Sequence, residues 1–140
     1  MSKKDKIRWL PRPEAHNYPA AHSYLSLFND EPTVNRLLQE LRRARISRFK
    51  SKDIFRASRL SLLGVSNGHV QKDREKIKSG TPLSPLLLVR DKANAQVIIA
   101  DGYHRLCAVY SFDEDAEIPS EVAPLQVDVL RRRMLEPAPA

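Results

Sequence analysis

The feature that most constrains this chain is an apolar strand that passes directly into a helix through an Asp-Gly turn. Val97 to Ala100 are apolar and suit one buried strand, and a helical pattern begins at Gly102. The start of a helix leaves about four backbone N–H groups without intrahelical partners and carries about half a positive charge. The sequence therefore predicts an anion site at this turn. We expect Asp101 to cap the helix and Gly102 to let a ligand approach the backbone closely.

Two side chains in the first turn of this helix point to phosphate as the anion. Arg105 offers a fork of donors that suits phosphate oxygens, and His104 can donate to phosphate when it is protonated. Each candidate also has a structural alternative: a core histidine for His104, an ion pair with the acidic segment 113–117 for Arg105, and the helix cap for Asp101. Gly102, His104 and Arg105 are our candidate phosphate-binding residues, with Asp101 as a further candidate that could assist as a base or in magnesium binding.

The first 45 residues predict an extended arm followed by two helices. Prolines interrupt residues 1–16, and we expect Trp9 to anchor this arm on the body of the protein. Residues 17–29 favour a short helix. The next helix has Asp30 as its cap and a proline in its first turn. Its last turn carries three cations that the helix dipole favours, Arg42, Arg43 and Arg45.

Residues 46–127 predict an α+β unit, a small mixed sheet with flanking helices. Apolar and basic residues alternate over 46–50, as in a half-exposed strand, and Ser51 suits the cap of a short helix. A charged amphipathic helix follows over 69–78 and ends at Gly80. Its inward residues are expected to be Val70 and Ile77, with His69 as a further candidate.

The second half of this unit predicts a β-hairpin and a last strand. Two apolar segments, 82–90 and 96–100, flank a turn, and both strands of the hairpin are expected to be largely buried. Residues 118–127 contain another strand, which its two prolines place near a sheet edge. Residues 128–140 are expected to form a basic tail that is frayed.

The charge and the cysteine content restrict the class of protein. A net charge of +7 over 140 residues favours phosphorylated or polyanionic partners. The single cysteine, Cys107, excludes an intrachain disulfide and a zinc site built from several cysteines, and we expect it in the core. The histidines lack metal-ligand spacing, so no metal site is predicted. Without an apolar segment of about 18 residues or a signal-peptide core, we expect a cytoplasmic protein with no membrane partner.

A stretch rich in cations, from Arg42 to Arg59, is the second candidate site. It spans a helix end, a strand and a helix, and it contains one acidic residue, Asp53. The stretch could form one face for DNA or RNA, with Arg42, Arg43 and Arg45 as the nucleic-acid candidates, although a solvated face is the simpler explanation. Lys52 follows the first predicted strand and is a further candidate for neutralising phosphate, while Asp53 is a conceivable base for phosphoryl transfer.

Several of these segments, taken in order, resemble the ParB/sulfiredoxin domain. In that family a Gly-x-His-Arg box opens a helix after a strand, as in Asp101–Ala108, and residues 73–80 are similar to the helix that leads into its Pro-apolar-Val strand, here Leu83–Val89. The resemblance covers roughly residues 46–127 and implies a small α/β fold that holds the phosphates of a nucleotide at the box. Carried over by position, Gly102, His104 and Arg105 become the phosphate-binding residues. The implied ligand is ATP, ADP or CTP, with magnesium as a candidate companion.

The chemistry of that family varies, and two departures narrow it here. Sulfiredoxins reduce cysteine sulfinic acid with ATP, ParB proteins bind and hydrolyse CTP as they load onto DNA, and some relatives phosphorylate free serine. The catalytic cysteine of sulfiredoxins immediately precedes His-Arg, where this chain has Tyr103, which argues against sulfinate reduction. No helix-turn-helix region follows Val127, so we do not expect a complete partition protein.

These observations leave three hypotheses for function. The first is nucleotide binding at residues 102–105, with hydrolysis or phosphoryl transfer left open. The second is a nucleic-acid-binding or regulatory module that uses its basic surface without catalysis. The third is an interaction module in which residues 1–45 recognise a protein partner.

Overall fold

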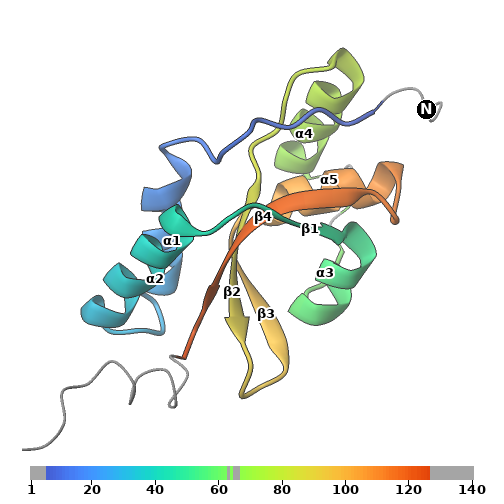
Figure 1. Ribbon diagram of the computed structural model, residues 1–140. Helices are drawn as coiled ribbons and strands as arrows, with labels where there is room; N and C mark the ends of the chain where they lie inside the picture. The colour runs from blue at the N-terminus through green and yellow to red at the C-terminus, as the bar shows by residue number, and fades with distance from the viewer. Residues whose placement is uncertain (1–5, 63, 65–66, 127–140) are drawn as a thin grey trace, which may run out of the picture.

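A four-stranded mixed sheet with the strand order β1-β4-β2-β3 forms the centre of the computed structural model, which describes residues 6–62, 64 and 67–126 (Figure 1). The strands are β1 (Ser47–Lys50), β2 (Leu86–Asp91), β3 (Gln96–Asp101) and β4 (Glu117–Pro124). β4 pairs antiparallel with β1 and parallel with β2, and β2 pairs antiparallel with β3. The predicted hairpin is therefore confirmed as β2 and β3.

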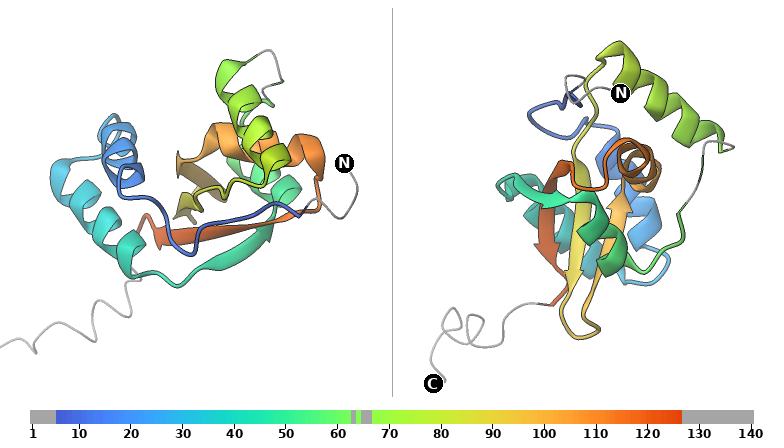
Figure 2. Two further views of the ribbon diagram at one scale, coloured as in Figure 1. Left: turned by 90° about the horizontal axis from the view of Figure 1, so that it is seen from above. Right: turned by 90° about the vertical axis from the view of Figure 1, so that its right-hand side faces the viewer.

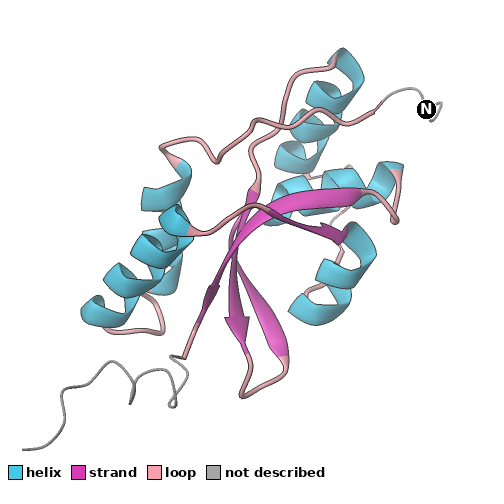
Figure 3. Cartoon of the chain, viewed as in Figure 1, coloured by secondary structure: helices cyan, strands magenta, loops and turns pink. Residues whose placement is uncertain are grey.

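Helices cover both faces of the sheet, which confirms the predicted α+β class (Figures 2 and 3). They are α1 (Asn17–Leu25), α2 (Glu31–Arg43), α3 (Ser51–Ser58), α4 (Gly68–Ser79) and α5 (Tyr103–Phe112). Side chains alternate across a strand, so Leu87 and Val89 face α1 and α2 while Leu86 and Leu88 face α3 and α5. α4 packs on the outer side of α5, where it contributes Val70 and Ile77 to the core.

Local signals explain where most helices begin and end. Asp30 caps α2 by accepting a hydrogen bond from the backbone N–H of Thr33, and Gly80 ends α4 with a φ of 77°. Two other predictions were wrong. The Ser51 hydroxyl donates to the carbonyls of Asp113 and Glu114, so it ties α3 to the α5–β4 turn and caps nothing. α2 ends at Arg43, so Arg45 lies in the connection to β1.

The strand over residues 118–127 is central, and its predicted position near a sheet edge was wrong. β1 runs beside β4 only from Glu117 to Ser120, and β2 runs beside it only from Ser120 to Pro124. Each proline of β4 therefore has a neighbouring strand on one side alone. A proline lacks a backbone N–H donor, and the unpaired side accommodates that loss.

The N-terminal arm is extended and docked, as its sequence predicted. Trp9 forms a parallel bridge with Leu83 and packs against the core, and the backbone N–H groups of Leu10 and Leu83 donate to the carbonyls of Leu83 and Arg8, both at 2.8 Å. α1 ends at Leu25, earlier than the predicted helix over 17–29. The predicted tail, 128–140, lies outside the described residues.

The arm and α1 meet the sheet at a buried carboxylate, Glu121 of β4, whose side chain is fully buried. The Tyr18 hydroxyl donates to Oε1 of Glu121 at 2.8 Å, and Nη2 of Arg12 lies 2.8 Å from Oε2. Burial raises the pKa of Glu121, and burial together with this hydrogen bond raises the pKa of Tyr18 to about 12. Residues on both sides of the boundary predicted after residue 45 therefore share one core.

Candidate phosphate-binding site

The turn between β3 and α5 requires glycine for two reasons. Gly102 is the N-cap of α5 and has a φ of 114°, in the left-handed region that side chains with a Cβ rarely adopt. A Cβ built on Gly102 would lie 2.7 Å from Cγ of Leu86 and 3.0 Å from Nη2 of Arg105. The close approach predicted for a ligand is therefore made by two protein side chains.

Asp101 does not cap α5, so this prediction was wrong. It is the last residue of β3, and within the described chain no side chain caps this helix start. The Asp101 carboxylate accepts a hydrogen bond from Nη2 of Arg105 at 3.1 Å instead. The backbone N–H groups in the first turn of α5 therefore keep no side-chain acceptor, which suits a bound anion.

Arg105 ties several elements to this turn. Its Nη2 donates to Asp101, to the carbonyl of Pro85 at 3.2 Å and to Oδ1 of Asn17 at 3.3 Å, and its side chain is 15% exposed. The alternative ion pair with residues 113–117 is wrong. Oδ1 of Asn17 also accepts a hydrogen bond from the Ser84 hydroxyl at 2.6 Å, so the start of α1 supports the turn.

A pocket of about 250 Å³ opens between α4 and the N-terminus of α5. The turn contributes residues 101–105, and one face of α4 supplies the opposite wall: His69, Lys72, Asp73 and Lys76. Gly102, His104, Arg105 and Asp101 of the predicted site thus lie together. We call this cavity the α4–α5 pocket. It combines the positive end of a helix with lysine and histidine side chains, and so can attract an anion.

The contribution of α4 to this pocket was not predicted from the sequence. His69 is exposed and faces the pocket, so its predicted inward position was wrong. A signal was present, because positions 69, 72, 73 and 76 follow the spacing of one helical face. That spacing identifies a polar stripe, but it does not show that the stripe faces Gly102.

Two histidines meet inside the pocket. The ring centroids of His69 and His104 are 4.9 Å apart, and the planes are tilted by 42°. Burial lowers the pKa of His104, and the nearby His69 lowers it further, while Asp73 and Asp101 act in the opposite direction. Burial raises the pKa of Asp73, against the effect of Arg105 and Lys76. The unliganded pocket therefore favours neutral His104.

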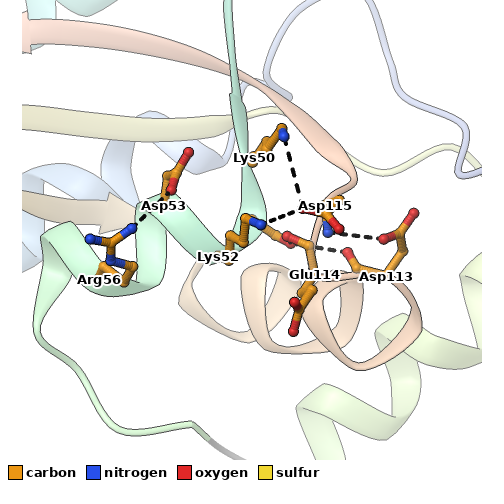
Figure 4. A network of polar contacts seen from close by, with 8 residues as sticks. Lys50, Lys52, Asp53, Arg56, Asp113, Glu114 and Asp115 are labelled. Atoms are coloured by element: carbon orange, nitrogen blue, oxygen red, sulfur yellow. Dashed lines mark hydrogen bonds and ion pairs between the residues drawn. The ribbon is translucent and has the colours of Figure 1, made fainter.

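Lys52 lies outside this pocket. Its Nζ is 2.7 Å from Oδ1 of Asp115, and this pair raises the pKa of Lys52 and lowers that of Asp115 (Figure 4). Asp115 follows the C-terminal end of α5, whereas the pocket is at the other end of this ten-residue helix, about 15 Å away. The structure does not bring Lys52 and His104 together. Asp53 pairs with Arg56 at 3.6 Å and does not line the pocket.

The basic stretch from Arg42 to Arg59 divides into two parts. In the second part, Lys50 and Lys52 pair with Asp115, and Arg56 pairs with Asp53 (Figure 4). Arg59 donates to the carbonyls of Asn94 and Ala95. In the first part, no carboxylate of a described residue lies within 4.0 Å of the guanidinium groups. These side chains are Arg42, Arg43, Arg45 and Arg48, which we call the arginine cluster.

Cys107 is fully buried in the core, as predicted, one turn beyond Tyr103. The Tyr103 hydroxyl donates to the carbonyl of Ser61, which ties Ser61 to α5. Among residues 6–62, 64 and 67–126, no group of three or more His, Cys, Asp or Glu could hold a metal ion. No helix in the same residues is long and apolar enough to cross a membrane.

Comparisons of the chain with protein-family models, with curated proteins and with solved structures find no match. The residues around the α4–α5 pocket and the arginine cluster are therefore the basis for assigning a function. Both features are cationic, but they differ in form. One is a pocket at a helix N-terminus, and the other is an exposed surface.

Proposed function

We propose that this protein binds a nucleotide in the α4–α5 pocket through its phosphate groups. The observation that supports this most directly is the convergence of Lys72, Lys76 and His104 on the uncapped N-terminus of α5. Backbone N–H groups at a helix start and ammonium groups are the usual partners of phosphate. The resemblance of residues 46–127 to the ParB/sulfiredoxin domain supports a nucleotide as the ligand.

In this proposal the residues of the pocket have different roles. The backbone of the first turn of α5, His104 and the two lysines bind phosphate oxygens. Arg105 contributes mainly by positioning, because its Nη2 already donates to three protein acceptors. Gly102 sets the direction in which α5 leaves the sheet.

The size of the pocket indicates which part of the ligand it holds. Pockets that enclose a whole drug-sized ligand measure about 300–1,000 Å³, and the α4–α5 pocket measures about 250 Å³. It therefore suits phosphate groups, with the sugar and base extending toward solvent. ATP, ADP and CTP are all compatible with this arrangement.

We assign no reaction to the pocket. Tyr103 stands where sulfiredoxin chemistry needs a thiolate, and Cys107 is buried in the core. Magnesium does not fit as a resident ion, because Asp101 is committed to Arg105 and Asp73 is the one other carboxylate that lines the pocket. Magnesium is therefore part of the ligand in this proposal, as the complex it forms with nucleotide phosphates.

Isothermal titration with ATP, ADP and CTP, with and without magnesium, tests the proposal. We expect Lys76→Ala to weaken binding about tenfold, because a charge-assisted hydrogen bond contributes about 1.5–3 kcal/mol. Lys78→Ala is the matched control, because Lys78 lies on the same helix, is also exposed and does not line the pocket. Equal effects of the two substitutions, or no binding of any nucleotide by the wild-type protein, would contradict the proposal.

The titration of His104 predicts a pH dependence of nucleotide binding. The lowered pKa means that His104 is neutral in the unliganded protein at pH 7, and a bound phosphate favours its protonated form. Binding should therefore take up a proton, and affinity should rise as the pH falls from about 8 to about 6. Titrations in buffers with different ionisation enthalpies measure this uptake directly.

His104→Gln separates this effect from the titration of the phosphate itself. The variant should show smaller proton uptake and a flatter pH profile, and identical profiles for the two proteins would exclude His104 as the group responsible. The stability of the unliganded wild-type protein should change with pH in the direction opposite to its affinity for the nucleotide. Because the unfolded chain binds the proton more readily than folded His104, stability should decline as the pH falls below about 6.5.

A further inference from the structure

The arginine cluster lies on a backbone segment that other residues hold in place. The connection from α2 to β1 runs along the outer edge of the molecule, beside β4 (Figure 2). Nη2 of Arg12 donates to the carbonyl of Arg42 at 2.7 Å, and Nη1 donates to the carbonyl of Ala44 at 3.4 Å. Arg12 is itself paired with the buried Glu121. The cluster is therefore presented by a fixed backbone, although its guanidinium groups reach solvent.

Two side chains of the cluster, Arg42 and Arg48, lie on the α2 side of the sheet. Phe49 packs inward against the core on the α3 and α5 side, so Arg48, its neighbour on β1, points to the opposite side, where α2 lies. Arg43 and Arg45 are exposed at the end of α2 and just beyond it. The guanidinium carbon of Arg42 lies 4.3 Å from the centre of the Tyr18 ring, a cation–π contact that restricts this side chain.

We propose that the arginine cluster binds a nucleic-acid duplex through its backbone phosphates. All four cations are arginines, whose planar forks match phosphate oxygens better than lysine does. The segment offers no ring for stacking an unpaired base, because Tyr18 is buried under Arg42 and Phe49 packs inward.

A membrane surface fits the cluster less well than a duplex does. The large exposed apolar side chains among the described residues are outside the segment from Arg42 to Arg48: Tyr24, Leu27, Phe28, Leu60 and Leu62. The segment that carries the charge therefore offers no large exposed apolar side chain of its own that could enter a bilayer. Contacts to phosphates alone predict binding without sequence preference and with a strong dependence on salt.

Fluorescence anisotropy with labelled duplexes of about 20 base pairs, between about 50 and 200 mM salt, tests this proposal. The experiment compares a DNA duplex, an RNA duplex of the same sequence and the separate single strands. The two duplexes show whether the protein binds DNA or RNA. The test variant is Arg43→Ala with Arg45→Ala and Arg48→Ala. Arg42 is retained because it packs on Tyr18.

The matched control removes three exposed cations elsewhere, with Arg56→Ala, Lys78→Ala and Lys92→Ala. Both triple variants have the same net charge. We expect the test variant to bind a duplex at least about tenfold more weakly at 50 mM salt, with a salt slope shallower by about one per arginine removed. The control variant should change the affinity much less. Thermal unfolding followed by circular dichroism checks that both variants are folded. If the test variant is not folded, the single substitution Arg45→Glu replaces it.

Three results would overturn the proposal. The wild-type chain could fail to bind either duplex at about 50 mM salt. The test variant could lose no more affinity than the control variant. The protein could also bind single strands or anionic lipid vesicles in preference to duplexes. Because the cluster is separate from the α4–α5 pocket, His104→Gln should leave duplex binding unchanged, so failure of the proposed nucleotide function can be told apart from failure of this proposal.

Discussion

Removal of residues 1–45 is expected to unfold the remainder of the chain. Six side chains of α1 and α2 are buried against one face of the sheet: Tyr18, Ala21, Leu25, Val34, Leu37 and Leu41. Their removal would expose Leu87 and Val89, and burial of one such side chain contributes about 1.5–3 kcal/mol. Ala100 and Ala123 would be exposed as well. The combined loss is comparable with the whole stability of a typical domain, about 5–15 kcal/mol.

The same truncation would also remove both partners of Glu121. Its carboxylate would lose the hydroxyl of Tyr18 and the guanidinium of Arg12, so two interactions that tie the first 45 residues to β4 would be lost as well. Circular dichroism and heteronuclear NMR of residues 46–140 should show an unfolded or molten chain. Adding residues 1–45 as a separate peptide should restore native signals. Cooperative unfolding and unchanged nucleotide binding by 46–140 would instead make the first 45 residues an accessory.

Gly102→Ala is expected to destabilise the protein by about 2–5 kcal/mol and to abolish nucleotide binding. The left-handed conformation costs a residue with a Cβ about 1–2 kcal/mol. The new methyl group would also meet Cγ of Leu86 at 2.7 Å in the packed core, and overpacking of this kind costs about 1–3 kcal/mol. Relief of the contact would move the start of α5, and with it the backbone donors of the α4–α5 pocket. Urea denaturation measures the first effect, and calorimetric titration measures the second.

Gly80→Ala is the matched control for this substitution. Gly80 also has a positive φ, 77°, but a Cβ at this position would have no atom within 4 Å. Only the conformational cost of about 1–2 kcal/mol should remain, with nucleotide binding retained. Leu86→Ala combined with Gly102→Ala should cost less than the sum of the two single changes, because the smaller side chain removes the clash. Equal costs at the two glycines would show that the contact with Leu86 is unimportant.

Local patterns were sufficient to predict the β3–α5 turn and most elements around it. The change from an apolar run to helical spacing marks the end of β3, and Gly80 and Asp30 mark helix ends by their own chemistry. The burial of Val70 and Ile77 follows from their helical spacing. These signals depend on neighbours within a few residues, so one sequence is enough to identify them.

The rest of the site depends on contacts between distant segments. Asn17 accepts a hydrogen bond from Arg105 across 88 positions in the sequence, and α4 presents His69 to His104 only because the two helices pack together. Lys52 follows a strand, as predicted, but the sheet order places it at the opposite end of α5 from the pocket. The central position of β4 likewise depends on which strands flank it, whereas its prolines alone favour a position near the sheet edge.

The pairing of β4 also dictates the order in which the sheet can assemble. Among the described residues, β1 has one partner in the sheet, β4, and β4 is the last strand in sequence order. The β2–β3 hairpin can close locally within microseconds, whereas β1 has no strand to pair with until β4 has been made and has docked. During synthesis the basic edge of the molecule should therefore form late, and the rate of folding should respond to changes at Ser120, the one residue of β4 that pairs on both sides.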